Sequence, residues 1–172
     1  MKRRILLAVL LAALMIVTGS SGCLQPEIPR QNTNLNFIFQ YGVGAADILN
    51  TFDNSYTRDM VAGPPERIRM FLTDDEMNRI YAKMQEIGFF DYPTQFSIPT
   101  PKGPIGIVTP YQSYYFKVTM GTQVKELTWG DSITIPASEQ VDRLRELIRL
   151  IENIITAKPE YKNLPPPRGG YM

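Results

Sequence analysis

The chain has 172 residues, with 18 basic and 17 acidic side chains, a single cysteine and no histidine. The missing histidine excludes histidine-dependent catalysis and histidine metal sites, and one cysteine forms neither an internal disulfide nor a zinc site of several thiolates. The near-balance of charge argues against a nucleic-acid-binding protein, because such proteins normally concentrate basic residues on one face.

The N-terminal residues have the organisation of a secretory signal. Lys2–Arg4 are basic, Ile5–Val17 form an uninterrupted apolar run, and Thr18–Gly22 are small. The apolar run of 13 residues is shorter than the ~20 residues that span a bilayer comfortably. We therefore expect residues 1–22 to be a removable signal peptide rather than a permanent membrane helix.

Cys23 follows the predicted signal peptide directly. Ser21 and Gly22 match the small residues that precede the cysteine in the lipobox of bacterial lipoproteins, whereas Ser20 stands where an aliphatic residue is usual. Lipidation of Cys23 is therefore predicted, with ordinary signal cleavage that leaves a free thiol as the alternative. A lone thiol outside the cytoplasm would be a liability, which favours lipidation.

The predicted mature chain is long enough for one domain with its own core. Without residues 1–22 it has 150 residues, with 15 basic and 17 acidic side chains and a net charge of −2. It offers no polybasic patch to anionic lipids, so the predicted membrane attachment depends on acyl chains at Cys23. Residues 23–34 are polar and contain two prolines, which predicts a flexible tether before a folded domain over residues 35–158.

The first part of this domain is expected to form three strands. Leu35–Tyr41 alternate apolar and polar side chains, which is the period of a half-buried strand. Ala46–Val61 form a second, less regular extended stretch with a turn at Asp53–Asn54, and Glu66–Leu72 form a third strand with one apolar face.

A helix is predicted to begin after Thr73. Thr73 and Glu76 have the spacing of a capping box, in which each side chain binds the backbone N–H of the other residue. Gly88 stands where a left-handed residue ends a helix. The acidic run Asp74–Glu76 suits the positive end of the helix dipole, so capping explains it more simply than a metal or catalytic site. The apolar stripe of this helix comprises Met77, Ile80, Tyr81, Met84 and Ile87.

Residues 93–110 contain five prolines and two glycines. This composition predicts a long stretch without regular structure. Apolar residues within it, such as Ile105 and Ile107, argue against a simple polar linker. Long ordered loops are often functional. The alternative is an ordinary surface loop that connects two parts of the fold.

The last part of the chain is predicted to form a hairpin and a long helix. Tyr114–Met120 and Gln123–Trp129 alternate in polarity around Gly121–Thr122, which has the Gly-first form of a tight two-residue turn. A helix is expected over Ser138–Ala157, followed by a Pro/Gly-rich tail at 159–172 that should be polyproline-like or disordered. The apolar stripe of the helix comprises Val141, Leu144, Leu147, Ile148, Ile151, Ile154 and Ile155. Its polar face, expected to be solvated, comprises Arg143, Glu146, Arg149 and Glu152.

The order of these elements predicts an α+β fold, with an antiparallel sheet of about five strands and two helices packed on one face. Carboxylate, serine–lysine and tyrosine chemistry remain as candidates. A calcium loop would need glycine at Arg58 and glutamate at Pro64, so polar alternation along a strand explains its partial match better. The residues of that match are Asp53, Ser55, Thr57 and Asp59.

Aspartates from separate segments could also pair in space as acid and base. One sequence does not show which of them meet. We therefore assign no catalytic, cofactor-binding or metal-ligating residue, and expect no cofactor. The aspartates in question are Asp47, Asp53, Asp59, Asp91 and Asp131.

Three segments are notable together: Phe39–Gly42, the block from Leu72 to Pro93, and Lys158–Lys162. They resemble small uncharacterised lipoproteins of Gram-positive bacteria. The resemblance implies an extracytoplasmic location and a membrane anchor, and it brings no activity, substrate or site residues.

The sequence as a whole predicts an exported, lipid-anchored cell-surface protein. Its domain is expected to be a non-catalytic binding or accessory module, with a protein, a cell-wall component or a small molecule as ligand and no nucleic-acid partner. The alternative is an extracytoplasmic hydrolase that depends on carboxylates, motivated by the number of acidic residues and the predicted export.

Overall fold

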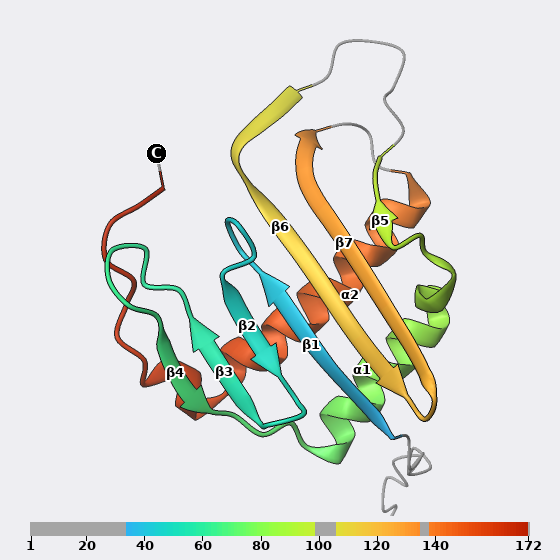
Figure 1. Cartoon of the computed structure of the whole chain (residues 1–172), viewed down its shortest axis with the longest axis horizontal. Helices are drawn as coiled ribbons and strands as arrows, with labels where there is room; N and C mark the ends of the chain where they lie inside the picture. The colour runs from blue at the N-terminus through green and yellow to red at the C-terminus, as the bar shows by residue number, and fades with distance from the viewer. Residues whose placement is uncertain (1–33, 99–105, 135–137, 172) are drawn as a thin grey trace, which may run out of the picture.

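The computed structural model describes residues 34–98, 106–134 and 138–171. These residues form two layers, a seven-stranded sheet and two long helices that lie against one of its faces (Figure 1). The predicted signal peptide, Cys23 and the predicted tether up to residue 33 lie outside the described residues. The strands are β1 (Leu35–Tyr41), β2 (Asp47–Asn50), β3 (Ser55–Arg58), β4 (Glu66–Arg69), β5 (Gln95–Phe96), β6 (Gly106–Met120) and β7 (Gln123–Thr134). The helices are α1 (Asp74–Glu86), the 3-10 turn η1 (Phe89–Asp91), α2 (Glu139–Ala157) and α3 (Pro159–Lys162).

The strands are ordered β4-β3-β2-β1-β6-β7-β5 across the sheet. Each neighbouring pair is antiparallel except β5 and β7, which run parallel. The predicted α+β class is confirmed. The predicted sheet of about five antiparallel strands is wrong, because the sheet is mixed and has seven strands.

One additional strand arises because the extended stretch predicted over Ala46–Val61 folds back on itself as β2 and β3. The turn between them is held by short polar contacts: the Ser55 hydroxyl donates to the Asp53 carboxylate at 2.6 Å, and Asn54 adopts a left-handed φ of 53°. Asparagine tolerates this conformation better than most residues. The predicted turn at Asp53–Asn54 therefore separates two paired strands.

The other additional strand is β5, which lies in the stretch 93–110 where no regular structure is predicted. It is only two residues long, too short to show a period, and Phe96 anchors it by packing edge-to-face on Trp129 with 5.7 Å between the ring centroids. The start of β6 also falls in this stretch. Pro110 fits there because it lies in the irregularity of the β6–β7 pairing between Ile107 and Gln112, where no ladder hydrogen bond needs its missing N–H.

The local predictions for the two long helices are confirmed. Thr73 and Glu76 form the capping box of α1, and Gly88 adopts a left-handed φ of 66° just after its end. Ser138 caps α2 by accepting a hydrogen bond from the backbone N–H of Val141. All seven residues of the predicted apolar stripe of α2 are buried.

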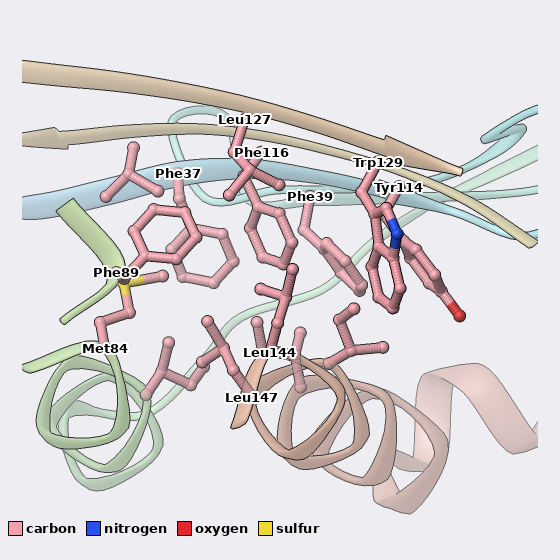
Figure 2. Packing of buried hydrophobic residues seen from close by; sticks show 14 of the residues in the cluster. Phe37, Phe39, Met84, Phe89, Tyr114, Phe116, Leu127, Trp129, Leu144 and Leu147 are labelled. Carbon is pink, nitrogen blue, oxygen red and sulfur yellow. The ribbon is translucent and has the colours of Figure 1, made fainter. Parts of the chain in front are cut away.

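The core lies between the helices and the covered face of the sheet. Phe37, Phe39 and Phe116 point from the sheet towards the helices, where they meet Leu144 and Leu147 of α2 (Figure 2). The remaining large aromatic side chains of this layer extend the cluster towards β7 and η1 (Figure 2). Burial of these side chains removes a large apolar area from water, which is the main stabilising contribution to the fold.

The chain after α2 packs back onto the domain. α3 follows immediately, and residues 163–171, which we call the C-terminal strap, continue beside β3 and β4 (Figure 1). Tyr161 and Leu164 are half-buried against the core, so the strap and α3 are attached to the same domain as the sheet. Among the described residues, no helix has the length and apolar character needed to cross a membrane.

Candidate functional site

The covered face of the sheet changes from apolar to polar at the far end of β1. Tyr41 pairs in register with Asp47 of β2, and Leu49 pairs with Tyr56 of β3. Because side chains alternate between the two faces of a strand, Asp47 and Arg58 lie on the same covered face as Leu49 and Tyr56. The aromatic core therefore ends in a group of polar side chains that point in the same direction.

These polar side chains are joined by hydrogen bonds. The hydroxyls of Tyr41 and Tyr56 lie 2.7 Å apart, and Tyr56 donates to Oδ1 of Asp47 at 3.2 Å. The same oxygen accepts the backbone N–H of Asp59 at 3.0 Å. Burial raises the pKa of the Tyr41 and Tyr56 hydroxyls, so both stay protonated and able to donate at neutral pH.

Burial also acts on the carboxylates of this group. It raises the pKa of Asp47, and the hydrogen bonds from Asp59 and Tyr56, together with the positive charge of Arg58, offset this only in part. Glu152 of α2 is half-buried beside them. The pKa of Glu152 is raised mainly by burial and further by the negative charge of Asp47. The two carboxylates therefore repel each other across a partly dehydrated space, where a ligand with hydrogen-bond donors or a positive charge would be stabilised.

A cleft lies over this group. It consists of two adjoining hollows of about 450 and 430 Å³, which we call together the polar cleft. The first hollow reaches Arg58 and Leu164, and the second reaches Tyr41 and Glu152. This size is within the range of small-ligand pockets. The residues that line both hollows are Asp47, Asp59, Thr156, Tyr161 and Pro167.

The structure brings together two of the five aspartates named from the sequence, Asp47 and Asp59. Asp53 instead forms an exposed ion pair with Arg67 at 2.6 Å, and Asp131 binds Arg145 at 2.7 Å. Asp91 is exposed in η1, away from the polar cleft.

The partial calcium-loop match is explained by other interactions. The Ser55 hydroxyl donates to Asp53 and accepts from Arg67, so this side chain is engaged with protein partners. Within residues 34–98, 106–134 and 138–171, no group of three or more potential metal ligands is found.

Several residues of the polar cleft were not anticipated. Glu152 was expected on the solvated face of its helix, and this is wrong because the end of α2 lies under β2, where Asp47 is its neighbour. Tyr41 and Tyr56 have the apolar–polar alternation of ordinary strand residues, so no local signal marks them. Cys23, the predicted lipidation site, lies outside the described residues.

Comparison with known proteins finds no family model that matches the chain and no curated protein that is similar to it.

Proposed function

We propose that the protein is exported, attached to the cell membrane by lipid on Cys23, and acts as a non-catalytic binding module of the kind that the resemblance to small lipoproteins implies. Its ligand would occupy the polar cleft. The observation that carries the proposal is this cleft itself, in which dehydrated carboxylates and tyrosine hydroxyls converge at one end of an otherwise apolar core.

The position of the cleft supports this role. The predicted tether enters the domain at Leu35, the first residue of β1, and the cleft borders Tyr41, the last residue of the same strand. Seven residues of β-strand span roughly 20 Å. A domain anchored through its N-terminus would therefore carry the cleft at the opposite end of β1 from the tether. Figure 1 shows the course of this strand.

Ligand binding is tested with the folded protein and a panel of small ligands that carry ammonium or amide groups, using the rise in Tm as readout. Glu152→Gln should abolish the rise caused by any ligand of the cleft. Glu126→Gln makes the same chemical change on an exposed part of β7 and should leave that rise intact. If no ligand in the panel shifts Tm, or if both variants respond like the wild type, the cleft is not the binding site.

The predicted anchor needs a separate test. Cells that express the full chain are labelled with a fatty acid, and Cys23→Ala is the matched variant. Label in the wild type and its loss in the variant support the anchor. Equal labelling of both proteins rules it out.

A carboxylate-dependent hydrolase is the second candidate, and one observation favours it. Asp47 and Glu152 lie in one cleft and burial raises the pKa of both, as it does for a carboxyl group that serves as a general acid. Asp47→Asn and Glu152→Gln should then each abolish hydrolysis. Activity that survives in both variants excludes this mechanism.

A further inference from the structure

Arg58 is a buried cation with unusual partners. The residue is 8% exposed, and its guanidinium lies 4.0 Å from the centroid of the Tyr161 ring. Its Nη1 donates to the backbone oxygens of Leu164 at 3.4 Å and Pro165 at 3.1 Å, both in the C-terminal strap. Because an unpartnered buried charge is strongly unfavourable, these carbonyls are part of what keeps Arg58 in place.

The strap is bound through its backbone and through the Tyr171 hydroxyl, which donates to the Asp59 carboxylate. Residues 165–167 are all prolines, which lack an N–H and are extended before binding, so little conformational entropy is lost when they dock. Just beyond them, the N–H of Arg168 donates to the oxygen of Met60 at 3.1 Å. The N–H of Ala62 donates to the oxygen of Arg168, also at 3.1 Å. A parallel bridge between Val61 and Arg168 completes this contact.

The surface under the strap has the components of a site for proline-rich peptides. Such sites combine aromatic rings with donors to the peptide carbonyls. Here the side-chain donor is Arg58, which lies over the Tyr161 ring, and Tyr161 borders the same hollow as Pro166 and Pro167. The backbone of Met60–Ala62 provides the extended pairing. We call this surface the strap groove. Residues 165–170 are themselves exposed, and the groove binds the backbone of Pro165 and Arg168. Any similar proline-rich segment would offer the same backbone atoms.

We propose that the strap groove recognises a proline-rich peptide of a partner protein, and that residues 164–171 occupy it as an intramolecular competitor. The proposal rests on the binding function proposed above and names the class of partner. Displacement of the strap would also withdraw Pro167 and Tyr171 from the wall of the polar cleft. Partner binding and access to Asp47 and Glu152 are therefore coupled.

The test uses the full chain and a labelled peptide that copies residues 164–171. In the variant Pro165→Gly/Pro166→Gly/Pro167→Gly the strap loses its extended preference and should leave the groove. This variant should bind the peptide at least ~10-fold more tightly than the wild type, because a tethered competitor acts at an effective concentration of about 1 mM. Adding Arg58→Lys, which keeps the charge but loses the fork of donors, should weaken binding again. Arg67→Lys on exposed β4 is the matched control and should leave peptide binding unchanged.

A second measurement on the wild type covers the case in which the triple variant does not fold. With saturating peptide, the Arg168 amide should lose its protection from hydrogen exchange, since it belongs to the displaced strap. The Ala62 amide should keep its protection, since it belongs to the groove and pairs with the peptide. Unchanged exchange at Arg168, or peptide binding that is insensitive to Arg58→Lys, overturns the proposal.

The outcome also separates this proposal from the preceding one. If the peptide does not bind but small ligands still raise Tm in a manner that depends on Glu152, only the peptide proposal fails. If neither the peptide nor any small ligand binds, the binding function fails with it. A dimer formed by exchange of straps, without peptide binding, would assign the groove to a second copy and overturn the partner peptide.

Discussion

Replacing Leu144 by alanine tests whether the interface between α2 and the sheet carries the stability of the domain. Leu144 is fully buried and lies among the aromatic side chains that descend from β1 and β6 (Figure 2). Removing its three outer carbon atoms loses their transfer free energy and leaves a cavity, which together cost about 2–5 kcal/mol for a leucine in a core. We expect Leu144→Ala to lower the free energy of unfolding by ~3 kcal/mol, or Tm by roughly 6–12 °C for a domain of this size.

Leu150→Ala is the matched control, because it makes the same substitution on the same helix at a half-buried position. Its expected cost is roughly 1–2 kcal/mol, since less apolar surface is removed from the core. Both values are measured by urea unfolding followed by circular dichroism. A Leu150→Ala variant that is destabilised as much as Leu144→Ala would refute the reasoning, because the cost would then not follow burial.

Three further predictions concern single side chains of the cleft and the helix ends. Because burial raises the pKa of Glu152 above its usual 4.5, the folded state holds the proton more tightly than the unfolded state, so ionisation above that pH destabilises the fold. Glu152→Gln should therefore be more stable than the wild type at pH 7 and lose this advantage near pH 4, which is measured as Tm against pH. A Tm difference between the two proteins that is the same at pH 4 and pH 7 would contradict this prediction. Thr73→Ala should lower the free energy of unfolding by ~1 kcal/mol in urea and Thr73→Ser should hardly change it, because serine also caps the helix. Equal destabilisation by both variants would argue against the capping contact. Gly88→Ala should cost about 1–2 kcal/mol for its left-handed φ of 66°, whereas Gly170→Ala, with open space around it, should be neutral by the same measurement.

The features that could be predicted from the sequence are those with local causes. The capping box at Thr73, the left-handed Gly88 and the apolar stripe of α2 each depend on residues within a few positions of one another, so spacing alone reveals them. The tight turn at Gly121–Thr122 belongs to the same group, since it joins directly paired residues of β6 and β7.

The features that could not be predicted depend on long-range contacts. β5 exists because Phe96 meets Trp129 from a distant part of the chain, and two residues carry no period. The polar cleft joins Asp47 to Glu152, and the strap groove joins Arg58 to Pro165, with more than 100 residues between the partners in both cases. Spacing and composition hold no information about such pairs.

The place of β1 in the sheet has a mechanical consequence. β1 is paired with β6 over Leu35–Gln40 and with β2 over Ile38–Tyr41, and its two ends face the predicted tether and the polar cleft. A pulling force between a membrane anchor and a bound ligand would act along this strand, perpendicular to its interstrand hydrogen bonds. These bonds would share the load in shear instead of opening one after another. In a protein that is anchored and binds a ligand as proposed above, β1 would therefore hold the ligand under tension.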